Sequence, residues 1–456
     1  MVEFQNNIKE EQFVKTVIRW WLRVVQEYLP STYVLAIFLT FVVFIMGLFI
    51  TDQSFMQMVK HWGNGYPLLF RFSMQMVLML LTGFIIALAP ATQRGLDWVT
   101  NQAKTPTQGI VIVGIISSLF CYFNWGMGLV VGAFLARAMG AKVKGLHFPL
   151  IIAAAYAGEV IRGPSSAIPL VSATSGSFMA KIMGKTVPVT DTLYSGWNIS
   201  ITIAIIIILV ISYVYVHNII PVSDRTQFEE DKDKEPLQPS NDTKPKSFSD
   251  KLEKSYFTNA IFGLLPLIYI IMTFYTKGFA LNLNLVVMIF LTIGIFMHRS
   301  PEAYLIAIKE AVVATRGIII QFPIYAGIMG MMKASGLVDS MANWFVMIST
   351  PQTFPLYCLW AAGFVNIFVP SGGGQWAVQG PIMIKAAMKM GADLPLTIMS
   401  FAWGDSWTNQ IQPFWALPLL GVAGLSARDI MGYCFFFFLL AGIFLSGMFL
   451  LLGFLA

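Results

Sequence analysis

Long apolar stretches alternate with short polar connections along most of the chain. Nearly continuous apolar residues cover 33–50, 199–216, 260–275, 283–297 and 431–455. A helix needs about 20 mainly apolar residues to cross the hydrocarbon core of a bilayer. Because a spanning segment must also satisfy its own backbone hydrogen bonds, the pattern predicts an all-α membrane protein with many spans.

The N-terminal residues, 1–30, differ from this pattern because they are charged. Within 11–29, Lys15, Arg19 and Arg23 recur every four residues, and apolar residues fall on the opposite side. This spacing is typical of an amphipathic helix that lies on a membrane surface, and a disordered tail is the alternative. We expect a cytoplasmic amphipathic helix.

The long polar tract 222–255 is rich in Asp, Glu, Lys, Pro and Ser. Such a composition cannot bury enough apolar surface to fold, so it predicts a solvated linker, which we place in the cytoplasm. The linker separates a first transmembrane half, 31–221, from a second, 256–456.

The two halves resemble each other in sequence. Segments 149–159 and 395–405 both begin with Pro and end with Gly followed by an acidic residue. Three further pairs keep the same order: Thr-Pro at 105 and 350, Pro-Leu at 169 and 418, and Asp near Tyr at 191 and 429. Four matches in one order favour an internal repeat.

Each half also contains a polar interruption that predicts a re-entrant hairpin, at 107–139 and at 353–390. The second half begins with an additional span, 257–276, so its spans cross in the opposite sense. We therefore expect an inverted repeat in which hairpin 107–139 opens inward and hairpin 353–390 opens outward. A broken span follows each hairpin, at 148–182 and 395–425.

The distribution of cations supports this orientation. Most of the 29 Lys and Arg residues fall on connections assigned to the cytoplasm, in line with the positive-inside rule. The cations assigned to the outside are Lys60, Lys181, Lys185, Lys277, Lys333, Lys385 and Lys389. Arg71 and Arg162 fall at membrane depth or at its edge.

Composition narrows the class of protein. Hydrophobic residues make up 57% of the chain and charged residues 11%, whereas soluble domains carry about 25% charged residues. The net charge of +6 is spread among apolar spans, so no nucleic-acid partner is expected. Zinc-protease and serine-hydrolase motifs do not occur, and we expect no enzymatic activity. Cys121, Cys358 and Cys434 lie in apolar stretches and predict buried thiols.

Four polar interruptions inside apolar stretches are candidate binding segments: 124–128, 163–176, 370–375 and 408–413. Lipid cannot satisfy the backbone groups of a broken helix, so such breaks line a protein or water cavity. In transporters with inverted repeats, paired breaks form the substrate and ion site. Close helix packing at Gly is the alternative explanation.

The residue types in these breaks suit a small carboxylate. Gly-rich turns let backbone amides and helix N-termini approach an anion, and neutral side chains add donors without a buried cation. The candidate binding residues are Asn124, Trp125, Gly126, Gly128, Ser165, Ser166, Thr174, Ser371, Gly372, Gly373, Gly374, Gln375, Asn409 and Gln412.

Three charged residues fall inside the membrane, where ionisable groups mark functional sites. Glu159 and Asp405 occupy equivalent places in the two halves, each directly after Gly, and are candidates for coupling transport to an ion. Arg162 lies three residues after Glu159, so it could bind substrate or pair with Glu159 on one helical face. Asp405 could instead only orient the break.

Specific motifs in and after these breaks resemble the short-chain fatty acid transporter family. They are N-W-G-M-G-L-V-V-G at 124–132, V-P-S-G-G-G-Q-W at 369–376, Q-G-P at 379–381 and Q-P-F-W-A-L-P at 412–418. The resemblance covers nearly the whole chain except the first 30 residues and the linker.

The resemblance implies the fold of the ion transporter superfamily, which includes dicarboxylate/sodium symporters. That fold has inverted repeats, two re-entrant hairpins, two broken helices, a dimerising scaffold and an elevator-type transport domain. The resemblance places the hairpin tips at 124–128 and 371–376, which adds Trp376 to the candidate residues, and it implies a homodimer.

We therefore expect a secondary transporter of small monocarboxylates, such as acetoacetate or butyrate, in the cytoplasmic membrane of a bacterium. The coupling ion is left open between H⁺ and Na⁺, with Na⁺ placed near Asn124 and Asn366, and no other cofactor is expected. The alternatives are a C4-dicarboxylate or other organic-anion symporter, an intramembrane enzyme, and a passive channel.

Overall fold

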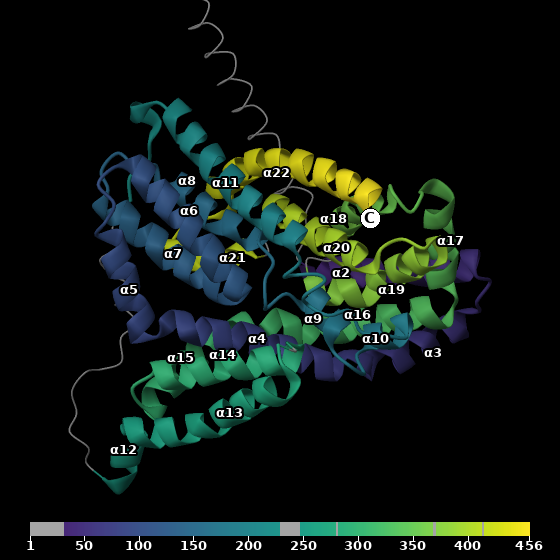
Figure 1. Ribbon diagram of the computed structural model, residues 1–456, viewed down its shortest axis with the longest axis horizontal. Coiled ribbons are helices and arrows are strands. Elements are labelled where there is room, and N and C mark those ends of the chain that lie inside the picture. Colours follow the sequence, from purple (N-terminus) through teal and green to yellow (C-terminus); the bar gives the residue numbers. More distant parts are fainter. Residues whose placement is uncertain (1–31, 229–246, 280, 368–370, 413–414) are drawn as a thin grey trace, which may run out of the picture.

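The computed structural model describes residues 32–228, 247–279, 281–367, 371–412 and 415–456, and every regular element in these ranges is a helix (Figure 1). The expected helix at 1–30 and most of the linker lie outside the described residues. The helices before the linker are α2 (Thr32–Ile50), α3 (Phe55–Gly65), η1 (Tyr66–Leu69), α4 (Phe70–Leu88), α5 (Pro90–Thr100), α6 (Pro106–Phe123), α7 (Trp125–Lys142), α8 (Phe148–Ala157), η2 (Gly158–Val160), α9 (Ala167–Ala173), α10 (Phe178–Met183) and α11 (Gly196–Ile219).

The helices of the second half follow the same order of long spans and breaks. They are η3 (Val222–Asp224) and α12 (Phe248–Glu253) at the ends of the linker, then α13 (Tyr256–Lys277), α14 (Leu283–Met297), α15 (Pro301–Ala314), α16 (Arg316–Ala334), α17 (Leu337–Ile348), α18 (Phe354–Asn366), α19 (Gly372–Met390), α20 (Leu394–Thr408), η4 (Asn409–Ile411), α21 (Ala416–Ala423) and α22 (Ala427–Leu455).

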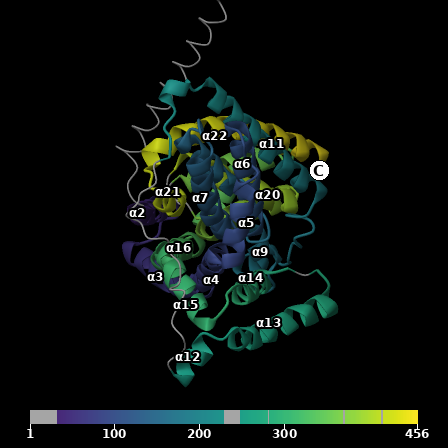
Figure 2. The same cartoon turned by 90° about the vertical axis from the view of Figure 1, so that its left-hand side faces the viewer.

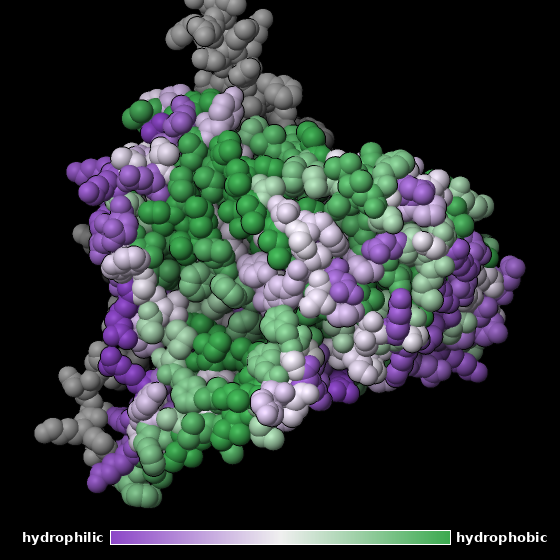
Figure 3. All heavy atoms as spheres, in the orientation of Figure 1, coloured by the Kyte–Doolittle hydropathy of each residue, from purple (hydrophilic) through white to green (hydrophobic). Residues whose placement is uncertain are grey.

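The surface of the molecule suits a lipid environment. Six helical segments in the described ranges are long and apolar enough to cross a membrane. Helix α13 exposes Phe257 and Leu265, and lies at the edge of the molecule opposite α22 in both views (Figures 1 and 2). Hydrophobic residues cover much of the upper part of the face in Figure 3, over α11 and α22, and hydrophilic residues gather beside α5 at one end and α17 at the other. Exposed apolar area on this scale is stable in lipid rather than in water.

Several short helices were not part of the sequence prediction: α3, α5, α15 and α17. Their start signals are nevertheless readable. Ser54 and Gln57 form a reciprocal capping box at the start of α3, with bonds of 3.3 and 2.7 Å. Ser300 caps α15 directly before Pro301. These helices are too short or too polar for a search based on membrane-spanning length to find them.

The first helix pair bends at Asn124, which ends α6 and caps α7. Its backbone is extended, and its side-chain Oδ1 accepts a hydrogen bond from the N–H of Met127 at 3.0 Å. Its Nδ2 donates to the carbonyl of Met79 at 3.1 Å, which fixes the bend against α4. A Cβ at Gly128 would collide with Cys121 on α6, so this glycine allows the two helices to pack closely.

The second helix pair, α18 and α19, lies on the opposite half of the molecule from α6 and α7 (Figure 1). Ser371 caps the start of helix α19, and its Oγ accepts the N–H of Gly374 at 3.3 Å. Each pair is followed by a helix that breaks: α8 passes through η2 into an extended segment before α9, and α20 passes through η4 before α21. The candidate site is built around these two breaks.

Candidate functional site

The two broken helices meet through Glu159 and Asn409. The Asn409 amide donates to both carboxylate oxygens of Glu159, at 3.2 and 3.0 Å. Tyr156, one turn before Glu159, donates its hydroxyl to the Asn409 carbonyl at 2.8 Å. All three residues are buried. The break after α20 is therefore tied directly to the break after α8, and backbone groups freed by the breaks gain partners.

A buried guanidinium links the two acidic residues. Arg162 donates from Nη1 to Oε1 of Glu159 at 3.0 Å and to the Glu159 carbonyl at 2.8 Å, and from Nη2 to Oδ2 of Asp405 at 3.4 Å. Arg162 thus forms the predicted pair with Glu159, and it also lines a cavity. With all three groups ionised, the cluster carries a formal charge of −1.

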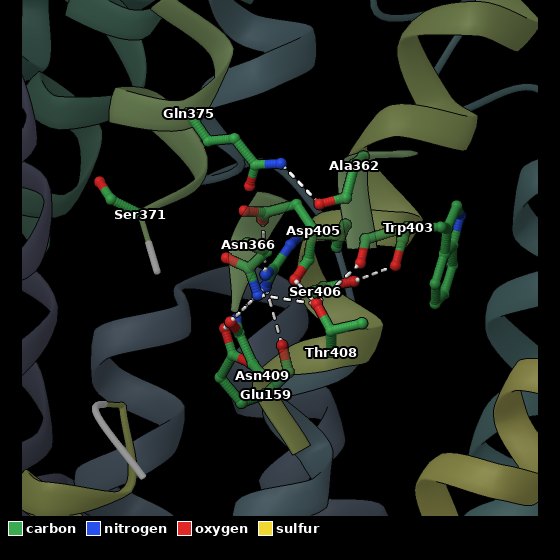
Figure 4. Close-up of polar contacts among 12 residues, drawn as sticks. Glu159, Ala362, Asn366, Ser371, Gln375, Trp403, Asp405, Ser406, Thr408 and Asn409 are labelled. Carbon is green, nitrogen blue, oxygen red and sulfur yellow. Dashed lines mark hydrogen bonds and ion pairs between the residues drawn. The ribbon is translucent and has the colours of Figure 1, made fainter. Parts of the chain in front are cut away.

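Neutral side chains extend this cluster toward α18 (Figure 4). Asn366, at the end of α18, donates its amide to Oδ1 of Asn409 at 2.6 Å and to the hydroxyl of Thr408 at 2.9 Å. Gln412 donates to the same Asn409 oxygen at 3.0 Å. Asn409 is therefore the centre of a hydrogen-bond network that joins the end of α18, both breaks and Glu159.

A cavity of about 50 Å³ lies against this cluster. Three of the four candidate segments contribute to its wall: Trp125 from the first, Ser165 and Ser166 from the second, and Ser371, Gly372 and Gly373 from the third. Arg162 lines it directly before the second segment, and Asp405 and Trp415 line it on either side of the fourth. A single water needs about 10–15 Å³ of such volume, so the cavity is the size of a few water molecules.

The Gly-rich start of α19 is shaped by close contacts. A Cβ on Gly372 would lie 2.9 Å from Oδ2 of Asp405, and a Cβ on Gly373 would lie 2.6 Å from the Phe72 ring. The first N–H groups of a helix have no partner within it. Ser371 accepts the N–H of Gly374 with its side chain and that of Gln375 with its carbonyl, but not those of Gly372 and Gly373. The amides of Gly372 and Gly373 therefore belong to a helix end with positive character on the cavity wall.

Some buried polar atoms have no hydrogen-bond partner in the described ranges. They include Oδ1 of Asp405, Oδ1 of Asn366 and Oε1 of Gln375. Buried oxygens without a partner are costly, and they are where proteins hold water or ions. Such oxygens are suitable ligands for Na⁺, and the carboxylate oxygen of Asp405 could also accept a proton. Asn124, by contrast, uses its amide to cap α7 and to bind Met79.

Other candidate residues lie away from the cavity. Gln375 donates to the Ala362 carbonyl at 2.6 Å and to Gln379 at 2.9 Å, and so ties α19 to α18. The ring of Trp376 is fully buried and packs edge-on against Phe401 at 4.7 Å. Thr174 caps the end of α9, donates to the Leu170 carbonyl and faces a different, larger cavity.

Gly126 and Gly128 do not line the cavity either. A Cβ on Gly126 would lie 2.6 Å from the Leu80 side chain. Both glycines therefore serve packing at the bend, which is the alternative explanation for glycine in a membrane helix. Gly374 lies against the Tyr325 ring in the same way.

Sequence reasoning missed the apolar side of the cavity. The residues concerned are Met76, Ile161, Ile168, Ile318, Phe322 and Trp415. Trp415 packs edge-on against Trp125 at 4.9 Å. Residues of this kind fill every membrane helix, so nothing in their sequence distinguishes a cavity wall from ordinary core. Only the position of Trp415, directly after the break at 408–413, offered a signal.

The fold resembles a solved transporter. The crystal structure of the YdaH transporter of Alcanivorax borkumensis, described as having an unusual topology, matches with a TM-score of 0.51 at 14% identity. The match covers 93% of this chain and 98% of the other. At this identity the likeness concerns the all-helical fold alone.

Sequence comparison is more specific. The family profile described as short chain fatty acid transporter matches residues 13–452. A protein of Escherichia coli (strain K12), provisionally named a short-chain fatty acid transporter, is 40% identical over 94% of this chain and 97% of its own length. A protein of Haemophilus influenzae with the same provisional name is 40% identical over 92% of this chain and 96% of its own. The chain is therefore a multi-pass membrane transporter, not an enzyme, and belongs to the short-chain fatty acid transporter family.

Proposed function

We propose that this chain is a secondary transporter of short-chain monocarboxylates, such as butyrate or acetoacetate, across the bacterial cytoplasmic membrane. The observation that carries the proposal is that residues in or beside all four breaks line one small buried cavity. One side of the cavity is polar and the other is formed by Ile161, Ile318 and Phe322. This division matches a molecule with one carboxylate and a short apolar end.

The carboxylate end belongs near Arg162, the serine hydroxyls and the start of α19. Ser165 and Ser166 supply hydroxyl donors, and Gly372 and Gly373 supply amides at a positive helix end. The apolar end then lies against Ile318 and Phe322. Because the cavity encloses only about 50 Å³, it favours short acids over long ones.

The charge of the cluster supports coupling to a cation. Glu159, Asp405 and Arg162 together already carry a formal charge of −1, and a bound carboxylate would make it −2. Burying another uncompensated charge is costly, so a cation should accompany each substrate anion. We propose H⁺ or Na⁺ for this role.

Asp405 is the acidic residue better placed to receive that cation. Glu159 is held by Arg162 and by two bonds from Asn409, whereas Asp405 has one long contact and one oxygen without a partner. Arg162, Glu159 and the start of α19 are the charged or polar groups that face Asp405. A proton or Na⁺ at its free oxygen would offset the charge of the substrate.

The arrangement of the helix pairs supports alternating access. The α6–α7 pair and the α18–α19 pair lie on opposite halves of the molecule (Figure 1). We propose that the first opens inward and the second outward, within an inverted repeat. We also propose an elevator-type motion and a homodimer, and both rest on family membership.

Uptake of labelled butyrate by proteoliposomes tests the proposal. Imposed H⁺ and Na⁺ gradients, applied separately, should show which of the two drives accumulation above that of empty liposomes. Absence of uptake for every monocarboxylate of two to six carbons would contradict the proposal. The dicarboxylate alternative predicts competition by succinate; we expect little, since the single guanidinium in the cavity is already paired with two carboxylates.

A further inference from the structure

A second cavity, much larger than the first, is lined by cations. Its volume is about 390 Å³, and Arg71, Lys181, Lys333 and Lys385 line it with no acidic residue among the lining side chains. Lys385 is paired with Asp339 at 2.9 Å. The other three cations form no ion pair within the ranges that the structure describes. Three uncompensated positive charges therefore border one cavity.

Four helices line both cavities, so the two lie in series. Each helix lines the buried cavity with one part and the larger cavity with another, as these examples show in that order: Met76 and Phe72 on α4, Ile168 and Val171 on α9, Phe322 and Lys333 on α16, and Gly373 and Lys385 on α19. A helix rises 1.5 Å per residue, so Lys333 lies about 16 Å along α16 from Phe322. Lys333 is therefore well separated from the buried cavity.

An aromatic pair separates the cavities. Phe72, on the wall of the larger cavity, stacks on Phe322, on the wall of the buried one, with ring centroids 5.7 Å apart. Phe178 packs edge-on against Phe72 at 5.9 Å. On the other side, Phe72 touches the Gly373 backbone so closely that no Cβ would fit. Both stacked rings are buried.

We propose that the larger cavity is an outer vestibule that concentrates small carboxylates, and that Phe72 and Phe322 form the gate between it and the buried site. This proposal rests on the proposed function. A cleft lined by one sign of charge raises the local concentration of the opposite ion. The hydroxyl of Ser175 on the same wall adds a neutral donor that suits a hydrated anion. The order of spans predicted from the sequence also places Lys181 and Lys333 on the outside.

The vestibule can be tested without measuring transport. A Ser175→Cys variant places a thiol on the vestibule wall. The native cysteines are buried, so the wild-type protein gives the background rate of reaction. In proteoliposomes of neutral lipid at low salt, the anionic sulfonatoethyl methanethiosulfonate should react about tenfold faster than the cationic trimethylammonioethyl reagent, relative to their rates with free thiol. Adding Arg71→Gln, Lys181→Gln and Lys333→Gln should remove this preference.

The matched control is Lys185→Gln, an exposed lysine four residues from Lys181 that does not line the cavity. It should leave the preference unchanged. Equal rates for the two reagents, or an equal effect of Lys185→Gln, would overturn the proposal. A preference that disappears when anionic lipid is added to the vesicles would assign the cavity to lipid headgroups and would also overturn it.

The gate has a separate readout. A Ser166→Cys thiol lies in the buried cavity and should react slowly with the anionic reagent. Phe72→Ala should raise that rate about tenfold or more by removing the ring, and Phe72→Leu should raise it less. Phe322→Leu serves as a second variant if Phe72→Ala does not fold. Unchanged rates in a folded gate variant would show that the rings do not separate the cavities.

Transport kinetics then connect the vestibule to uptake. Neutralising Arg71, Lys181 and Lys333 should raise the KM for butyrate about threefold to tenfold at low salt, with kcat unchanged, and the difference should shrink as salt screens the charges. If the wild type transports butyrate and the neutralised variant has the same KM, the vestibule fails while the proposed function stands. If the wild type transports no monocarboxylate, the proposed function itself fails.

Discussion

Asn409 donates its amide to both oxygens of Glu159, and this pair joins the two broken helices across 250 positions of sequence. Hydrogen bonds to a charged group contribute about 1.5–3 kcal/mol each. With two such bonds removed, Asn409→Ala should lower the stability of the purified protein by about 3–6 kcal/mol, seen as a lower midpoint in thermal unfolding. Asn409→Asp should be more harmful, because it places a second carboxylate against Glu159. An alanine variant as stable as the wild type would contradict the structural role of the pair.

Asp405→Asn should separate binding from coupling. The variant keeps the shape of the side chain and removes the negative charge that the coupling cation would neutralise. We expect exchange of labelled for unlabelled butyrate between the two sides to persist, and accumulation driven by an ion gradient to fall about tenfold or more. Glu159→Gln is the comparison, and it should impair folding or binding because Glu159 holds Arg162 and Asn409. Gradient-driven uptake by Asp405→Asn at the wild-type level would exclude Asp405 as the coupling residue.

Gly373 should not tolerate a side chain. A Cβ would lie 2.6 Å from the Phe72 ring, so Gly373→Ala requires a shift at the gate, and Gly373→Leu should abolish substrate binding while membrane insertion remains. The matched control is Gly447→Ala, since a Cβ at Gly447 meets nothing within 4 Å. Binding of butyrate to purified protein by calorimetry distinguishes the two. Equal affinity in Gly373→Leu and wild type would refute the placement of α19 at the site.

Phe322 should limit the length of the acid. Its ring forms part of the apolar wall of a cavity of about 50 Å³. Replacing Phe by a smaller residue creates space that a longer alkyl chain can fill, so Phe322→Leu should improve uptake of hexanoate relative to butyrate. A competition assay with unlabelled acids of increasing length measures the change. An unaltered order of preference would place the alkyl end elsewhere.

His147, in the connection between α7 and α8, should make stability depend on pH. Burial, with help from His217 and Arg225, lowers the pKa of His147 to about 4. Its Nδ1 accepts the N–H of Thr226 at 3.0 Å, a bond that only the neutral ring can accept. The folded state thus binds a proton less readily than the unfolded chain. The contribution of neutral His147 to the stability of the fold is complete above the unfolded pKa, about 6.5. It is lost as the pH falls from there toward 4.

Thermal unfolding in detergent between pH 7 and pH 4.5 measures this effect. One pKa unit corresponds to about 1.4 kcal/mol, so up to about 3 kcal/mol is lost across the window. His147→Gln should lower stability at pH 7 and flatten the pH dependence. An equally steep slope in that variant would assign the effect to other groups.

The positions of the long spans and of the breaks could be predicted from the sequence because they depend on local composition. Apolar length determines a span, and clusters such as S-G-G-G at 371–374 determine a helix start. The roles of individual break residues could not be predicted, because they depend on what lies opposite. Gly128 faces Cys121 and serves packing, whereas Gly372 faces Asp405 at the cavity.

The same limit applies to side chains from distant segments. Thr174 and Ser166 belong to one predicted break, yet they face different cavities because α9 lies between them. Phe72, Ile318 and Phe322 were invisible as site residues, since an apolar residue in a membrane helix carries no local signal. The link between Arg162 and Asp405 required two chain segments to be placed in space.

The charge of the buried cluster has a consequence for energetics. If one monovalent cation accompanies each carboxylate to hold the cluster at −1, the loaded and the empty carrier have the same charge. A cycle of this kind moves no net charge across the membrane. Each elementary charge moved through 100 mV corresponds to about 2.3 kcal/mol, and this transporter would gain none of it. Accumulation would then follow the chemical gradient of the cation alone and would be unaffected by membrane voltage.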